Sequence, residues 1–201
     1  SILGIESSFR QVKMKIGLVP VSAKPYHAGH HYLIETAASK NDKVIVFAST
    51  SDRKRKGEFP VSGKVMQDIW VNEILQLMPD NVDVVFGGSP VRKVYEAIGD
   101  ACEAGDCLDS FTVYSDVVDT KMNYSSANRE KYMQPLWSAG QVTFAAESIP
   151  EAFIRGAGAP DIRAEDVRRH LADRNFIEFG KCMPEGMNAY ACYQKLLHFP
   201  V

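Results

Sequence analysis

Apolar and polar positions along the chain alternate between short β-branched runs and longer amphipathic segments. Residues 14–21 form an apolar run that predicts a buried strand, and residues 29–40 carry apolar side chains at helical spacing. A second β-branched run covers residues 44–48. These three segments predict a strand, a helix and a second strand, the βαβ unit of parallel sheets.

The same alternation continues along the rest of the chain. It predicts a helix over 62–78, a strand over 82–86, a helix over 91–98, strands over 111–114 and 141–145, a loop at 156–160, a helix opening at 164–171 and a terminal helix over 188–197. We therefore expect an α/β fold, a single Rossmann-like domain with a five-stranded, mostly parallel sheet, helices on both faces and a helical C-terminal section. This domain is expected to cover residues 14–201, with residues 1–13 as an arm, native or added.

The composition is that of an ordinary globular protein, with 45% hydrophobic and 24% charged residues among 201. The net charge of −2 argues against bulk nucleic-acid binding. No apolar run approaches the roughly 20 residues needed to span a bilayer, and residues 1–13 lack the apolar stretch of a signal peptide, so a cytoplasmic location is expected. We expect the cysteines, whose spacing fits no zinc or redox motif, to be reduced structural thiols: Cys102, Cys107, Cys182 and Cys192.

A small cluster of histidines follows the first predicted strand and opens the helix behind it. His27 and His30 are three positions apart, and Gly29 between them allows a backbone to come close. The N-terminus of a helix favours polyphosphates, and ligands of open parallel sheets bind beyond the carboxyl ends of the strands. The cluster therefore predicts a phosphate site, with His31 expected to be an ordinary residue of the helix surface.

Residues 25–30, Pro-Tyr-His-Ala-Gly-His, resemble the P-F-H-x-G-H signature of the HxGH nucleotidyltransferase superfamily, with Tyr26 in place of Phe. Members of this superfamily join a nucleoside triphosphate to a phosphate-bearing small molecule. The resemblance implies that His27 and His30 stabilise the charge that builds up during attack on the α-phosphate, without a covalent enzyme intermediate.

The same resemblance implies roles for further residues outside the pair of histidines. Ser22 stands where relatives have Thr, Ser or Arg, so its hydroxyl or amide is predicted to meet the nucleotide, as is Gly29. Lys24, where relatives have Asp or Gln, is predicted to assist catalysis by touching phosphate, the alternative being a solvated lysine. Asp116 follows the fourth strand and is predicted to hold a substrate hydroxyl or the acceptor, although a carboxylate there can equally cap the next segment.

A second landmark of the superfamily is an I-S-x-T-x-x-R segment that binds the β- and γ-phosphates. Residues 162–168 resemble it, but Arg163 and Glu165 stand at the Ser and Thr positions. Arg168, and secondarily Arg163, are therefore predicted to bind the triphosphate through charge-assisted hydrogen bonds. The alternative is an ordinary helix whose arginines are solvated.

Residues between the landmarks carry a concentration of positive charge. Residues 59–64 resemble the P-x-S-x-x-x-R segment that opens the second helix of the superfamily and closes over the acceptor. The basic run at residues 53–56 precedes this segment and either attracts phosphorylated substrates or is a solvated loop.

These observations favour a nucleotidyltransferase that transfers the nucleoside monophosphate part of a triphosphate to a phosphate-bearing small molecule and releases pyrophosphate. ATP is the preferred donor, because the motif looks most like adenylyltransferases acting on nicotinamide mononucleotide or phosphopantetheine. The alternatives are a cytidylyltransferase that uses CTP and a phosphorylated alcohol, and a nucleotide-binding module without catalysis. Mg²⁺ is expected as cofactor with no metal ligand assigned to the chain, neither membrane nor nucleic acid is expected as partner, and a homo-oligomer is left open.

Overall fold

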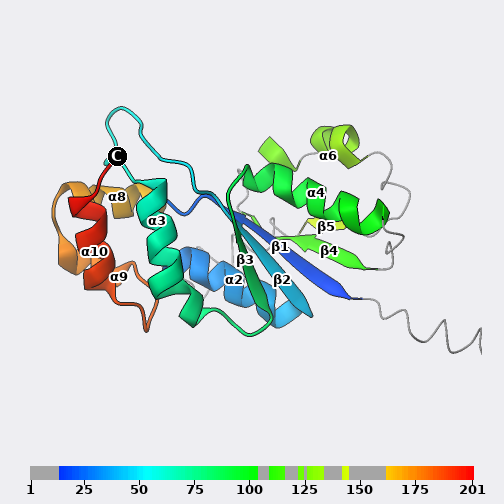
Figure 1. The fold of residues 1–201 in the computed structure, drawn as a ribbon, viewed down its shortest axis with the longest axis horizontal. Coiled ribbons are helices and arrows are strands. Elements are labelled where there is room, and N and C mark those ends of the chain that lie inside the picture. The colour runs from blue at the N-terminus through cyan, green and yellow to red at the C-terminus, as the bar shows by residue number, and fades with distance from the viewer. Residues whose placement is uncertain (1–13, 104–108, 116–121, 125, 134–141, 145–161) are drawn as a thin grey trace, which may run out of the picture.

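The fold is built on a parallel sheet of five strands in the order β3-β2-β1-β4-β5 (Figure 1). The computed structural model describes residues 14–103, 109–115, 122–124, 126–133, 142–144 and 162–201. The strands are β1 (Lys15–Val21), β2 (Lys43–Ala48), β3 (Val82–Phe86), β4 (Ser110–Val113) and β5 (Val142–Phe144), and every neighbouring pair is parallel. The predicted α/β class and parallel sheet are confirmed.

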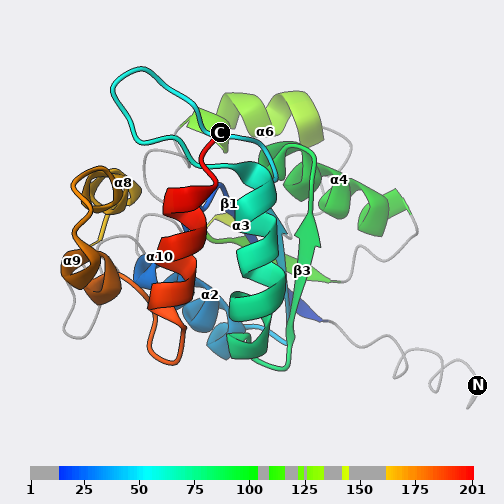
Figure 2. The same ribbon diagram turned by 60° about the vertical axis from the view of Figure 1, so that its left-hand side comes forward.

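Helices cover both faces of the sheet. They are α2 (Ala28–Lys40), α3 (Gly63–Ile69), α4 (Pro90–Glu103), α6 (Ser126–Met133), α8 (Ala164–Ala172), α9 (Phe176–Lys181) and α10 (Ala189–His198). Helices α2 and α3 and the C-terminal helices share one hydrophobic core, and α4 packs over the other face (Figures 1 and 2). The predicted helical C-terminal section is confirmed. None of the described helices is long and apolar enough to cross a membrane.

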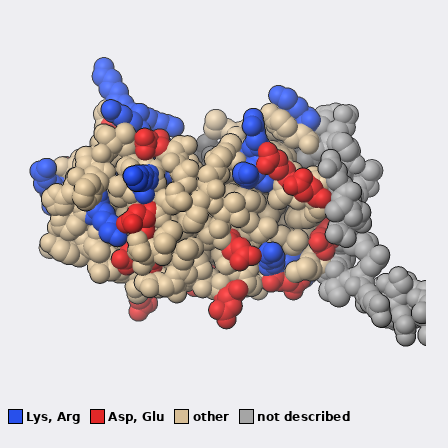
Figure 3. All heavy atoms as spheres, in the orientation of Figure 1, with Lys and Arg blue, Asp and Glu red and all other residues tan. Residues whose placement is uncertain are grey.

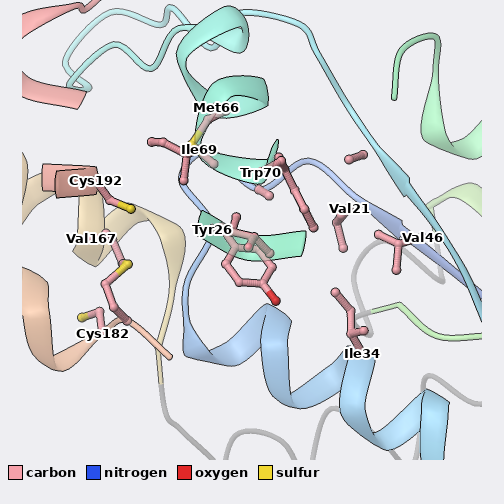
Figure 4. Close-up of a cluster of buried hydrophobic side chains, with 14 of the residues drawn as sticks. Val21, Tyr26, Ile34, Val46, Met66, Ile69, Trp70, Val167, Cys182 and Cys192 are labelled. Atoms are coloured by element: carbon pink, nitrogen blue, oxygen red, sulfur yellow. The ribbon is translucent and has the colours of Figure 1, made fainter. Parts of the chain in front are cut away.

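The larger core surrounds the ring of Tyr26 (Figure 4). Tyr26 packs edge-on against Trp70, with ring centroids 4.9 Å apart. Valines of β1 and β2 and the apolar side of α2 complete this core from the sheet side. Packing in the core therefore fixes the position of Tyr26, which immediately precedes His27.

The C-terminal section is tied directly to the start of α2. The N–H of Ala28 donates to the carbonyl of Cys182 at 2.7 Å, and Lys195 of α10 forms an ion pair with Asp68 of α3 at 2.9 Å. Cys182 and Cys192 are buried free thiols, as expected, and burial raises the pKa of Cys192 to about 12. Cys107 and the side chain of Cys102 lie outside the described part of the chain.

Three segments differ from the predicted elements. The helix expected over 62–78 is α-helical only as far as Ile69 and continues as a π-helical turn (Trp70–Ile74) and a 3₁₀ turn (Leu75–Leu77). The wider turn lets both Trp70 and Ile74 face the core. Helices α6 and α9 were not predicted. The expected loop at 156–160 and arm at 1–13 lie outside the described residues.

Candidate active site at the start of helix α2

The two motif histidines cap the helix that they open. His27 has extended backbone, with φ −146° and ψ 174°, and its Nδ1 accepts a hydrogen bond from the N–H of Gly29 at 3.0 Å. In return, Nδ1 of His30 accepts from the N–H of His27 at 3.1 Å. This is a reciprocal capping box in which imidazoles replace the usual Ser or Thr and Glu. The N–H of Gly29, predicted to meet the nucleotide, is therefore engaged by His27.

These two hydrogen bonds decide which ring nitrogen carries the proton. A backbone N–H can only donate, so the Nδ1 atoms of His27 and His30 must both be unprotonated. Each neutral ring therefore carries its hydrogen on Nε2, and the two rings lie with centroids 3.8 Å apart. The start of α2 thus presents two neutral N–H donors close together.

Burial keeps both rings neutral. Burial, and secondarily the charge of Lys24, lowers the pKa of His30 to about 4. Burial also lowers the pKa of His27, with His30 and Arg168 adding to the effect. At neutral pH each ring can therefore use Nδ1 as the acceptor of the cap and Nε2–H as a donor to an anion.

Acid is expected to destabilise the folded protein partly through His30. An unfolded imidazole binds a proton near pH 6.5, whereas the folded one resists it until about pH 4. Between these pH values the unfolded state binds more protons. The contribution of His30 to the free energy of unfolding is therefore fully present above about pH 6.5 and is lost as the pH falls toward 4. Thermal unfolding measured at steps between the two values should show a smaller acid-induced loss for His30→Asn than for the wild type. Parallel curves for the two proteins would contradict the lowered pKa.

Tyr26 packs against the imidazole pair from the side of the hydrophobic core. Its ring stacks on that of His30 at 5.5 Å with an interplanar angle of 20°, and Figure 4 shows its hydroxyl directed toward α2. The hydroxyl lies 2.8 Å from Nδ1 of His31, whose Nε2 lies 2.8 Å from a carboxylate oxygen of Glu35. The expectation that His31 is a surface residue is wrong, because its side chain is only 13% exposed. Tyrosine in place of the motif's phenylalanine was the sequence signal for this contact.

Lys24 reaches two backbone carbonyls at the carboxyl edge of the sheet. Its side chain is buried, and Nζ donates to the carbonyl of Ser22 at 2.9 Å and to that of Ser49 at 2.8 Å. Burial lowers the pKa of Lys24 to about 8, partly offset by the charge of Asp52. Lys24 thereby holds together the segments that follow β1 and β2, while its predicted role in catalysis stays a prediction.

Lys24→Met is expected to lower the free energy of unfolding by about 1–3 kcal/mol, because two carbonyls lose their donor. Chemical denaturation of the variant measures this, with the exposed Lys40→Met as a matched control that should change little. An unchanged stability together with a large fall in turnover would show instead that Lys24 acts mainly on the substrate.

The structure separates the two predicted arginines of α8. Arg168 is buried, and its Nη1 donates to the carbonyl of Lys24 at 2.7 Å, next to the motif. Arg163 is the N-cap residue of α8; its side chain is 69% exposed and lies 3.7 Å from Glu165. The fold therefore brings Arg168, 144 residues away in sequence, to the motif, and leaves Arg163 on the surface.

A cleft of about 200 Å³ opens at the same edge of the sheet. Ser22 is exposed and contributes to its wall, as does the first turn of α4. Asp116 lies outside the described residues, but the preceding Ser115 lines the cleft. Residues not identified from the sequence complete the lining: Ser49, Pro90, Val91, Asn123 and Tyr124. In the described part of the chain, no three or more His, Cys, Asp or Glu side chains are grouped as metal ligands.

One protein family resembles the part of the chain that contains the motif. Residues 16–68, which include the motif, match the family model of the citrate lyase ligase C-terminal domain. No curated protein matches the sequence.

Solved structures resemble the chain over most of its length. One is a nicotinate-nucleotide adenylyltransferase of Vibrio parahaemolyticus, with a TM-score of 0.53 and 14% identity over 93% of this chain and 100% of the other. A bifunctional NMN adenylyltransferase/ADP ribose pyrophosphatase of Francisella tularensis has a TM-score of 0.53 and 13% identity over 92% of this chain and 52% of the other. The nicotinic acid mononucleotide adenylyltransferase of Plasmodium falciparum has a TM-score of 0.50 and 10% identity over 93% and 100%. The chain therefore has the same fold as these adenylyltransferase structures.

Proposed function

We propose that the protein transfers the nucleoside monophosphate part of a nucleoside triphosphate, preferably ATP, to a phosphate-bearing small molecule. The observation that carries this proposal is the pair of neutral imidazoles, His27 and His30, whose Nε2–H groups are not used in the cap of α2. They stand at a helix N-terminus on the carboxyl edge of a parallel sheet, where this fold is expected to bind its ligand.

The proposed reaction needs no covalent bond between the protein and the substrates. A phosphate oxygen of the acceptor attacks the α-phosphorus of the triphosphate, the bond from that phosphorus to the bridging oxygen breaks, and pyrophosphate leaves. Negative charge develops on the α-phosphoryl oxygens, where fixed N–H donors are most effective. His27 and His30 supply these donors, and their positions are set by the cap of α2 rather than by the substrate.

Arg168 is proposed to bind the β- and γ-phosphates, with Arg163 as an outer contact, and Ser22 to meet the nucleotide. The cleft beside Ser22 and Ser115 is proposed to receive part of a substrate at this edge, and Asp116 is proposed as a further substrate contact. Mg²⁺ is proposed to enter with the triphosphate as its counter-ion, because the metal offsets charge on the phosphates.

Pyrophosphate release with a panel of acceptors tests the proposal. ATP or CTP is combined with nicotinamide mononucleotide, nicotinate mononucleotide, phosphopantetheine or phosphocholine, and His30→Asn is the matched control. We expect pyrophosphate and a nucleotidylated product in equal amounts from ATP and one of the first three acceptors. Activity with CTP and phosphocholine alone would favour a cytidylyltransferase. Nucleotide binding without pyrophosphate from any pair would favour the non-catalytic module.

A further inference from the structure

Two arginines from distant parts of the chain converge on one carboxylate beside the motif. Arg53 forms a bidentate pair with Glu58, in which Nε donates to Oε2 at 2.8 Å and Nη2 donates to Oε1 at 3.0 Å. Nε of Arg168 lies 3.5 Å from the same Oε2. Hydrogen bonds from Arg53, and secondarily the charge of Arg168, lower the pKa of Glu58, so the carboxylate is ionised.

The loop that carries Arg53 and Glu58 is closed by backbone hydrogen bonds. Arg53 and Val61 exchange both backbone hydrogen bonds, at 2.9 and 3.0 Å, and close the loop like a short hairpin. Gly57 turns its tip with φ +83°. Three cationic side chains stand exposed at the tip, where Figure 3 shows Lys and Arg projecting from the body of the protein: Lys54, Arg55 and Lys56.

Arg168 has more donors than this arrangement satisfies. Its side chain is only 7% exposed, and one hydrogen bond, from Nη1 to the carbonyl of Lys24, is formed within the described part of the chain. Its Nε is buried and makes no hydrogen bond there: it forms an ion pair with Glu58 at 3.5 Å, and both oxygens of that carboxylate accept hydrogen bonds from Arg53. A buried donor without an acceptor is costly, so this position favours an additional anion.

The identity of that anion follows from the geometry. Guanidinium groups match the geometry of both carboxylate and phosphate oxygens, so two of them facing one oxyanion can bind either group. Phosphate has three peripheral oxygens, enough for both Arg53 and the Nε of Arg168, whereas the carboxylate of Glu58 uses both of its oxygens on Arg53.

We infer that Arg53 and Arg168 form one phosphate site and that Glu58 occupies it in the absence of nucleotide, as an internal competitor of the triphosphate. This inference rests on the proposed function, which supplies the triphosphate. Binding then exchanges one anion for another: the terminal phosphoryl group takes Arg53 and Arg168, and Glu58 turns toward the exposed cations of the loop tip. A nucleoside monophosphate lacks the group that would displace Glu58.

The test is the binding of ATP, AMP and inorganic tripolyphosphate, measured by calorimetry for the wild type, Glu58→Gln and Arg53→Gln. Glu58→Gln keeps the shape but removes the competing charge, so ATP and tripolyphosphate should bind about fivefold more tightly, the scale of one like charge about 4 Å away with full screening by water. AMP binding should not change. Arg53→Gln should weaken both polyphosphates and leave AMP unaffected. Glu178→Gln, which breaks a surface ion pair with Lys181, is the matched control and should change nothing.

The sign of the Glu58→Gln effect decides the question. Weaker or unchanged tripolyphosphate binding would overturn the inference, because Glu58 would then position the arginines rather than compete for them. Unchanged polyphosphate binding by Arg53→Gln would overturn it as well. The proposed function is judged separately, by pyrophosphate release: tighter polyphosphate binding by Glu58→Gln without turnover on any acceptor supports the inference and rejects the transferase, and turnover without tighter binding does the reverse.

Discussion

His30→Asn is expected to fold normally and to lose about a hundredfold or more in turnover. The asparagine Oδ1 can replace Nδ1 as the acceptor for the N–H of His27, so the cap of α2 is kept. What it cannot replace is the Nε2–H, and one preorganised donor to a transition-state oxyanion is worth roughly 2.7–4 kcal/mol. Pyrophosphate release at saturating substrate measures the loss, and thermal unfolding verifies the fold.

Two further substitutions at His30 separate capping from catalysis. His30→Ala removes both nitrogens, so it should lose the same turnover and also about 1 kcal/mol of stability from the missing cap. His30→Gln keeps an N3 side chain that can accept from the N–H of His27, as in an ordinary capping box, and its amide N–H extends toward the position of Nε2, so it should retain the stability of the wild type and more turnover than His30→Asn. Normal turnover by His30→Asn would remove His30 from the mechanism.

Gly63→Ala is expected to lower the free energy of unfolding by about 3 kcal/mol or more. A Cβ at Gly63 would stand 1.9 Å from the carbonyl oxygen of Thr50 and 2.8 Å from the carbonyl carbon of Ser51. These are backbone atoms, so the whole segment after β2 would have to move. That segment continues into Asp52, whose Oδ1 accepts from the N–H of Gly63 at 2.8 Å.

Gly99→Ala is the matched control for this prediction. Gly99 lies within α4, and a Cβ there meets no atom within 4 Å from any other described segment of the chain. Alanine should therefore stabilise the helix slightly, by about 0.5–1 kcal/mol. Urea denaturation of the two variants should give opposite signs. Equal stability of Gly63→Ala and the wild type would contradict the close approach of α3 to the segment after β2.

The sheet and its helices were predictable where apolar periodicity is strong. The run at residues 44–48 lies within β2, and the helix expected from residue 29 onward corresponds to α2. The break of the second helix at Trp70 was not predictable, because an i, i+3, i+4 pattern is shared by an α-helix and a slightly wider turn. α6 is mostly polar and α9 spans six residues, so neither gives a helical pattern over the length that such a pattern needs.

The candidate site was predictable as a motif but not as a set of contacts. The spacing of His27 and His30 located the start of α2 and indicated their chemistry. It could not show that each ring caps the helix, since that depends on backbone conformation at His27. The contacts of Lys24 with Ser49, and of Arg168 with Glu58, join segments far apart in sequence, and a single sequence has no local signal for such pairs.

The order of the strands places the two histidines and the C-terminal contacts of the site in parts of the chain that we expect to pair at different stages of folding. β1, β2 and β3 are consecutive in both sequence and sheet, so residues 15–86 can pair through comparatively short loop closures. The histidines belong to this contiguous half. The guanidinium of Arg168 and the carbonyl of Cys182, which contact Lys24 and Ala28, come from the last part of the chain. Both of these contacts depend on segments from α8 onward, so the histidine motif alone does not define the complete site.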